Sequence, residues 1–308
     1  NQLASHDSGT AQSAWNSLSA DEGQPMVNRA IGGDLYPPGS TFKILTVAAA
    51  LRDGKANADT EMDAPDTLTL PGTNHALSNY AGESCGNGKV KLSYAFAESC
   101  NTPFAQLAMD VGYKDLSSEA EAWGFDDSQS IPLTVTPSRF PETNSDAETA
   151  MAGIGQASVR ATPLMMAQVA GTIANGGDQM KPYLVAQTLD SDLNVVDTTT
   201  PKVARTPISS QTAQALSSLM QQAVSDGTGS SAQVAGVSVA GKTGTAETGS
   251  DDGGPVTWFV GFAGTDLSKP SIALAIVLDG GEQTAATGTG GSVAGPMAAS
   301  IIDAAVDQ

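Results

Sequence analysis

Apolar residues recur at intervals of three or four in several stretches of the chain, each bounded by residues that start or stop helices. The clearest stretch begins at Ser40, directly after Pro-Pro-Gly, and ends near Gly54. Residues 91–113 predict two helices, interrupted at residues 99–101, with Pro103 in the first turn of the second. Further helices are expected at residues 161–177, 209–229 and 291–306.

Three runs near the end of the chain follow a different pattern, rich in β-branched and aromatic side chains. Glycine or Asp-Gly turns bound these runs, which cover residues 236–246, 256–264 and 271–280. Successive strands with short connections form antiparallel sheets, whose faces helices can cover. We therefore predict an α/β fold, an antiparallel sheet flanked by helices, with an additional all-helical subdomain. Residues 1–35 are expected to be irregular or short-helical, and residues 192–207 an ordinary polar connection.

Composition narrows the possible functions. The 308 residues are 40% hydrophobic and 5% aromatic, which suits a soluble globular protein. A net charge of −19 argues against a nucleic-acid partner and against anionic membrane surfaces. No apolar run approaches the roughly 18 residues that a membrane helix needs. With two cysteines and two histidines, the chain is expected to hold no zinc cluster, and we expect neither a metal nor a cofactor.

Residues 236–247, with the sequence GVSVAGKTGTAE, fit two motifs of incompatible chemistry. They match G-x-x-x-x-G-K-[ST], the phosphate-cradling P-loop, while residues 242–244 match the K-T-G box of a class of serine acyl-transferases. A P-loop needs a preceding strand and a following helix whose amides meet the phosphate. The residues that follow cannot start a helix, and Glu247, Asp251 and Asp252 among them would repel a triphosphate. A nucleotide-binding protein therefore remains only as the alternative from a different functional class.

A second motif is also misleading. Residues 82–86, with the sequence GESCG, match the nucleophile elbow G-x-S-x-G around Ser84. That elbow needs a strand before it, a helix after it and a histidine downstream. Because His6 and His75 both lie upstream of Ser84, we do not expect a Ser-His-Asp enzyme.

Ser40 and Lys43 fit S-x-x-K at the start of the first long helix. Residues i and i+3 share a face there, so the hydroxyl and the amine can touch. A serine hydroxyl is a weak nucleophile until a base removes its proton. A lysine can be that base if burial or a second cation lowers its pKa, and Lys242 would supply that cation. Taken alone, a capping serine beside a surface lysine would be the simpler interpretation.

Two further boxes follow in order, S-C-N at residues 99–101 and K-T-G at residues 242–244. Together YPPGSTFKI, SCNTPFAQLA and GKTGTAE resemble the transpeptidase domain of class B penicillin-binding proteins. Residues 28–43 and 153–177 are similar to further segments of that family. The cysteine of the middle box resembles the actinobacterial penicillin-binding protein A type.

The resemblance implies the fold shared by penicillin-binding proteins and serine β-lactamases. It also implies a D,D-transpeptidase that cross-links peptidoglycan stem peptides ending in D-Ala-D-Ala and is acylated by β-lactam antibiotics. Ser40 would attack the substrate carbonyl, Lys43 would accept the Ser40 proton, and Ser99 would pass a proton towards the leaving nitrogen. The backbone N–H groups of Ser40 and Thr245 would form the oxyanion hole. The side chains and backbone expected to hold the substrate are those of Asn101, Lys242, Thr243, Gly244 and Thr245.

The family also implies a cellular setting. Residues 1–308 are expected to be one transpeptidase domain. Because the family's sheet includes strands before the S-x-x-K helix and none is visible here, we expect the natural precursor to continue upstream, with those strands, a pedestal and a membrane anchor. The expected place is the extracytoplasmic face of the bacterial cell membrane, with divisome or elongation membrane proteins as partners.

A serine β-lactamase and a β-lactam sensor domain share the acylation chemistry and remain alternatives, as does an inactive scaffold domain. A β-lactamase must activate water, and in class A enzymes a glutamate does so. The E-x-x-L-N segment of that class is absent between the second and third boxes. The glutamates in that interval are Glu119, Glu121, Glu142 and Glu148.

Cys85 and Cys100 are expected to form a disulfide. An exported protein meets oxidising conditions, and an even number of cysteines permits pairing. The bridge would close a loop of about 15 residues and brace Ser99 and Asn101. Two buried free thiols are the alternative.

Overall fold

An antiparallel sheet organises the computed structural model, which describes residues 2–246, 254–280 and 288–306. Its three strands follow one another in the order of the chain, with the K-T-G box in the middle of the first. Lys242 lies opposite Val260 in this register, and Gly244 lies opposite Trp258. The strands are β11 (Ser238–Ala246), β12 (Val256–Gly264) and β13 (Ile272–Leu278).

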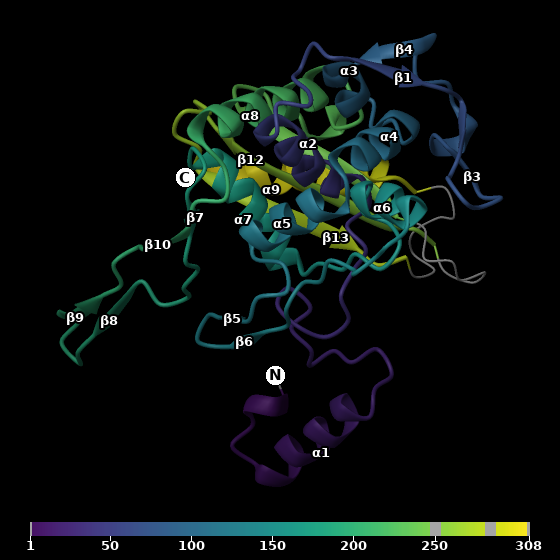
Figure 1. Ribbon diagram of the computed structural model, residues 1–308. Helices are drawn as coiled ribbons and strands as arrows, with labels where there is room; N and C mark the ends of the chain where they lie inside the picture. The colour runs from purple at the N-terminus through teal and green to yellow at the C-terminus, as the bar shows by residue number, and fades with distance from the viewer. Residues whose placement is uncertain (1, 247–253, 281–287, 307–308) are drawn as a thin grey trace.

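The central strand, β12, is buried along its whole length because helices cover both faces of the sheet (Figure 1). Successive side chains of a strand point to opposite faces. Trp258 and Phe262 join the main core with helices α7 and α8, whereas Phe259 and Ala263 join a second core with helix α9. These helices are α7 (Pro163–Ala174), α8 (Ser210–Ser225) and α9 (Gly295–Val306).

Helix α2 (Lys43–Arg52) lies inside the helical part of the chain and is buried from Lys43 to Ala50. A 3₁₀ turn at Gly39–Phe42 leads into it, so Ser40 precedes the α-helix proper. The surrounding helices are α3 (Leu92–Ala97), α4 (Thr102–Val111), α5 (Tyr113–Trp123) and α6 (Asp146–Gly153). Helix α1 (Ser8–Ser19) lies apart from the body, consistent with the expected lead-in (Figure 1).

In the described part of the chain, five short two-stranded ribbons surround this body, and the sequence did not predict them. Strands β9 and β10 fall within residues 192–207, so the expectation of an ordinary connection was wrong. The strands β8 and β9 are short and exposed on both faces, so they show no periodic pattern, and their hairpin reaches away from the body in Figure 1. The pairs are β1 (Glu61–Ala64) with β4 (Gly88–Lys91), β2 (Thr67–Thr69) with β3 (Ala76–Ser78), β5 (Gln129–Ser130) with β6 (Thr134–Val135), β7 (Gln179–Met180) with β10 (Val203–Arg205), and β8 (Gln187–Leu189) with β9 (Val195–Thr198).

Hydrogen bonds to two distant segments fix the turn before Ser40, one through a side chain and one through the backbone. Trp258 Nε1 donates to Pro37 O at 2.9 Å, and Gly39 N donates to Gly155 O at 3.0 Å. Gly155 has a φ of +72°, and a Cβ on it would overlap the Gly39 backbone. Glycine is therefore required where the loop after α6 packs against the turn that carries Ser40.

Gly155→Ala is expected to destabilise the fold by roughly 2–4 kcal/mol, because a left-handed backbone and an overpacked contact both oppose the methyl group. Gly54→Ala provides the matched control, since Gly54 has a φ of +65° with nothing within 4 Å of the added carbon. That variant should lose only about 1 kcal/mol. Urea unfolding measures both, and equal losses would show that the contact with Gly39 is unimportant.

Candidate active site

Three segments bring the residues of the three boxes to one cavity of about 420 Å³. Ser40 comes from the turn before α2, the S-C-N box from the turn between α3 and α4, and the K-T-G box from β11. The side chains of Lys43 and Lys242 lie behind the wall and are fully buried. The predicted residues that line the cavity are Ser40, Cys85, Ser99, Cys100, Asn101, Thr243, Gly244 and Thr245.

Lys43 ties helix α2 to the turn between α3 and α4. Its Nζ donates to Ser99 O at 2.7 Å, to Cys100 O at 2.8 Å and to Asn101 Oδ1 at 2.9 Å. Burial lowers the pKa of Lys43 well below its usual value, and the charge of Lys242 lowers it further. Among the hydrogen bonds of the described residues, none joins Ser40 Oγ to this amine. Three acceptors occupy all three protons of a charged Lys43.

Lys242 is the second buried amine of the site. Its Nζ donates to Thr243 O at 3.1 Å and has no carboxylate within ion-pair distance in the described part of the chain. Burial lowers the pKa of Lys242 to about 7, against the opposing effect of the Glu98 carboxylate. This amine therefore changes charge near neutral pH, whereas an exposed lysine stays protonated.

The S-C-N turn presents its backbone, rather than the Ser99 hydroxyl, to Lys43. Ser99 has a φ of +61°, a left-handed conformation that is uncommon outside glycine. No hydrogen bond of the described residues uses its hydroxyl, so the expected link from Ser99 to Lys242 is not made here. Asn101 holds Lys43 through Oδ1, while its Nδ2 donates to Ser78 O at 3.2 Å.

Strand β11, which carries the K-T-G box, contacts its neighbours through threonine hydroxyls and through the backbone of Gly244. Thr243 Oγ1 lies 2.6 Å from Thr228 Oγ1, and Thr245 Oγ1 accepts from Gly290 N at 3.2 Å. A Cβ on Gly244 would lie 2.8 Å from Pro38 O. The absence of a side chain at Gly244 therefore lets the turn before Ser40 pack directly on β11.

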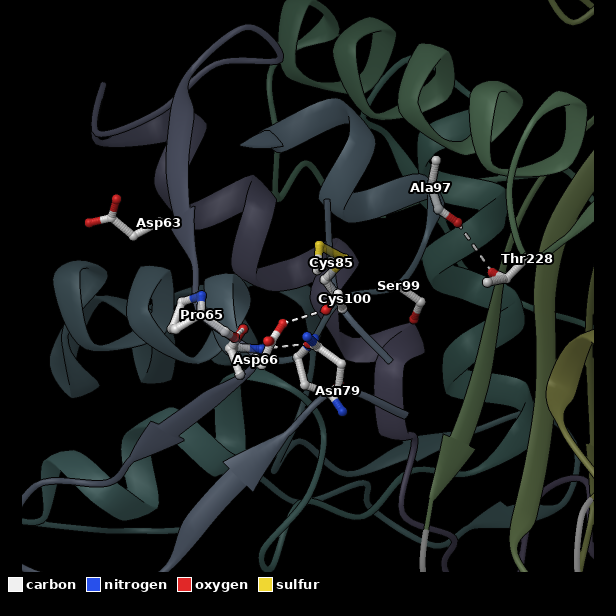
Figure 2. Close-up of a disulfide and its surroundings, with 12 residues drawn as sticks. Asp63, Pro65, Asp66, Asn79, Cys85, Ala97, Ser99, Cys100 and Thr228 are labelled. Atoms are coloured by element: carbon white, nitrogen blue, oxygen red, sulfur yellow. Dashed lines mark hydrogen bonds between the residues drawn. A yellow bond between two sulfur atoms is a disulfide. The ribbon is translucent and has the colours of Figure 1, made fainter. Parts of the chain in front are cut away.

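Asn79 is a site residue that the sequence did not single out. Its Oδ1 accepts from Asn101 N at 2.8 Å and from Thr102 N at 3.2 Å, which orients the start of α4. The structure also joins Cys85 and Cys100 by a disulfide, with Cα atoms 6.0 Å apart. Figure 2 shows Asn79 next to Cys100 and this bridge. Asn79 is 22 residues from Asn101 in the chain, and no local pattern marks it.

Within the residues that the structure describes, the P-loop pattern and the nucleophile-elbow pattern both lack the surrounding elements that their functions need. Lys242 and Thr243 lie in the middle of a buried strand, and no helix follows them directly in the described part of the chain. Glu247, Asp251 and Asp252, which weighed against the P-loop, lie outside the described residues. Ser84 donates to Asp66 Oδ1 at 2.6 Å and is not preceded by the strand that an elbow needs.

None of the described helices combines the length and the apolarity that crossing a bilayer would require. No described group of three or more histidine, cysteine, aspartate or glutamate side chains could hold a metal ion.

The sequence was then compared with known proteins. A family model described as the penicillin-binding protein transpeptidase domain matches residues 3–303. This chain belongs to that family. The predicted fold class and the resemblance drawn from the three boxes are therefore confirmed.

The transpeptidase domain has relatives in mycobacteria. It is 42% identical over 313 residues to the peptidoglycan D,D-transpeptidase PbpA of Mycolicibacterium smegmatis, covering 100% of this chain and 62% of the relative. PbpA of Mycobacterium tuberculosis is 39% identical over 310 residues, covering 99% of this chain and again 62% of the relative. The chain thus spans under two thirds of the length of these curated relatives.

Solved structures of similar proteins have the same fold. The ceftriaxone acyl-enzyme complex of M. tuberculosis penicillin-binding protein A superposes with a TM-score of 0.91 at 39% identity, covering 99% of this chain and 68% of that one. The penicillin G acyl-enzyme complex of that protein gives a TM-score of 0.89 at 40% identity, with the same coverage of both chains.

Lys242→Met is expected to change how the stability of the transpeptidase domain depends on pH. The pKa of Lys242 falls from 10.5 to about 7 on burial, so folding releases its proton between these values and stability rises with pH there. Without the amine, the slope of the unfolding free energy against pH should fall by about 1.4 kcal/mol per unit between about pH 8 and pH 10.

Urea unfolding at a series of pH values gives these slopes. The exposed Lys89 supplies a matched control, and Lys89→Met should leave the slope of the wild-type chain unchanged. Parallel curves for the wild type and Lys242→Met would mean that the buried amine keeps its proton on folding.

Proposed function

We propose that residues 1–308 form one transpeptidase domain that cross-links peptidoglycan stem peptides ending in D-Ala-D-Ala. The observation that supports this most directly is the meeting of all three boxes at one cavity, with two buried amines behind it. The M. smegmatis and M. tuberculosis relatives carry the name peptidoglycan D,D-transpeptidase, and the two M. tuberculosis structures are acyl-enzyme complexes with ceftriaxone and penicillin G. We extend both the substrate and the antibiotics to this chain.

In the first half of the reaction, Ser40 Oγ attacks the carbonyl carbon of the penultimate D-Ala. Its proton passes to Lys43, which must first give up one of its three hydrogen bonds and arrive without charge. The backbone N–H groups of Ser40 and Thr245 stabilise the oxyanion that forms. The C–N bond then breaks, the leaving amine of the terminal D-Ala takes the proton from Lys43 through Ser99, and a neutral Lys43 and an acyl-enzyme ester on Ser40 remain.

In the second half, an amine from a neighbouring stem peptide attacks the ester carbonyl. It loses a proton to Lys43, the bond between the acyl carbon and Ser40 Oγ breaks, Lys43 gives the proton to Ser40 Oγ, and the new amide is the cross-link. Thr243 and Thr245 bind the carboxylate of the donor peptide beside Gly244, and the positive charge of Lys242, buried behind them, attracts that carboxylate. The Oδ1 of Asn101 already accepts a hydrogen bond from Lys43. Its Nδ2 now donates to Ser78 O, and once that bond breaks Nδ2 donates to the substrate backbone.

This chemistry belongs outside the cytoplasm, where peptidoglycan is assembled. We therefore place the transpeptidase domain at the extracytoplasmic face of the bacterial cell membrane, acting in cell division or cell shape. Divisome or elongation membrane proteins would be its partners. The Cys85–Cys100 disulfide supports this placement, because such bonds persist in oxidising compartments.

A serine β-lactamase is the competing function, and the cavity lining argues against it. Buried Glu119 accepts from Trp123 Nε1 at 2.8 Å and pairs with Arg52. Among the described acidic residues, Glu83 and Glu98 line the cavity. None of the glutamates between the second and third boxes lines this cavity, namely Glu119, Glu121, Glu142 and Glu148.

Incubation with penicillin should add the mass of the drug to one peptide, the one that contains Ser40. Ser40→Ala should abolish the adduct and keep the fold, because it removes only the attacking oxygen. Peptide mass spectrometry locates the adduct, and circular dichroism checks the fold. Labelling of Ser84 or Ser99 in its place would identify a different nucleophile.

The penicilloyl-enzyme should persist for many minutes after free drug is removed, since no carboxylate from the interval between the boxes can activate water at the ester. Intact-mass spectrometry follows the decay. Loss of the adduct within seconds, with steady turnover of penicillin, would assign a β-lactamase. In that event Glu83→Gln and Glu98→Gln would show which cavity carboxylate activates the water.

A further inference from the structure

Each of the two buried lysines lies over a phenylalanine ring, and the two rings flank the S-C-N turn. Lys43 Nζ is 5.3 Å from the ring centre of Phe104 in α4, and Lys242 Nζ is 5.6 Å from that of Phe96 in α3. The ring centres are 6.2 Å apart, with an angle of 55° between the planes. All four side chains are fully buried.

We propose that Phe96 and Phe104 are positioning residues for acyl transfer, which set how readily Lys242 and Lys43, respectively, carry a proton. The face of an aromatic ring is electronegative and attracts a cation within about 6 Å of its centre, most strongly where water is excluded. A neutral amine gains much less from the same ring. Each ring therefore stabilises the charged form of one lysine and acts on the reaction through that lysine.

The rings matter because few other groups act on these amines. Lys43 faces the oxygens of Ser99, Cys100 and Asn101 and the charge of Lys242. Lys242 faces Thr243 O, the carboxylate of Glu98 and the charge of Lys43. No carboxylate forms an ion pair with either amine among the described residues. The aromatic faces are thus part of a small set of partners that compensate a buried charge.

The two lysines need opposite charge states when substrate arrives. This step rests on the proposed function, in which neutral Lys43 accepts the Ser40 proton and charged Lys242 attracts the substrate carboxylate. Phe104 then stabilises Lys43 after it has taken the proton, and Phe96 keeps Lys242 charged before the substrate binds. Removing either ring should lower the pKa of the lysine over it, with different consequences for the rate.

The test replaces each phenylalanine in turn by pentafluorophenylalanine, which keeps the ring shape but withdraws electron density from its face. The second-order rate of Ser40 acylation by a fluorescent penicillin is measured from about pH 5 to pH 10. At Phe104, the acid limb should move down by about one pH unit and the plateau rate should fall, because Lys43 becomes a weaker base. At Phe96, the alkaline limb should move down by about one unit, because Lys242 loses its charge earlier.

Phe262 in β12 provides the matched control, since its ring is fully buried and no described lysine nitrogen lies over it. Fluorination at Phe262 should move neither limb. Phe104→Leu and Phe96→Leu provide a second pair of variants, expected to shift the same limbs as the fluorinated rings.

The inference is wrong if Ser40 is acylated and both limbs stay in place when Phe104 and Phe96 are fluorinated, or if the Phe262 control shifts them equally. Failure of the proposed function would look different. In that case the wild-type chain would form no Ser40 adduct at any pH, leaving no limb to measure, or it would lose the adduct within seconds with steady turnover of penicillin.

Discussion

The burial of the Lys43 amine is the constraint on which the rest of the site depends. A charged or hydrogen-bonding group without water must find its partners inside the protein, or the fold loses stability. The Lys43 amine donates to three oxygens of the S-C-N turn, namely the backbone carbonyls of Ser99 and Cys100 and the side-chain amide of Asn101. This requirement fixes the distance between helix α2, which carries the lysine beside Ser40, and the turn between α3 and α4.

Several features that look unrelated in the sequence serve to hold that turn. Asn79 accepts from the first two N–H groups of the segment that begins α4. The Cys85–Cys100 bridge attaches the middle residue of the turn to the loop that carries Asn79. Thr228 N donates to Ala97 O at 3.1 Å, and the Thr228 hydroxyl lies 2.6 Å from that of Thr243. The turn is thereby connected to β11, so the second and third boxes keep a fixed separation.

The sequence predicted the parts of this arrangement that repeat a local pattern. Strand β12 was visible because both its faces are apolar, and the helix after Ser40 was visible from its prolines and apolar spacing. Helices α5 and α6 were missed, since their apolar positions are few and their neighbours polar. The three boxes meet at one cavity because residues far apart in the chain make contact, as Gly39 does with Gly155. Such contacts produce no periodic pattern in the sequence. The orientation of Ser99 was equally inaccessible, because a left-handed serine has no sequence signature.

The departures from ordinary local preferences gather around the cavity. Two lysines are buried in a core, a serine adopts a left-handed backbone, and Asn79 Nδ2 is buried with no partner among the described residues. Each of these costs stability, and none would be retained in a domain selected only to fold. The sheet and the helices α7, α8 and α9 are locally consistent by contrast, with apolar faces packed together. The apolar cores, which include the helical part as well as the sheet and its covering helices, offset these costs and so permit a lysine amine to be buried one turn after Ser40.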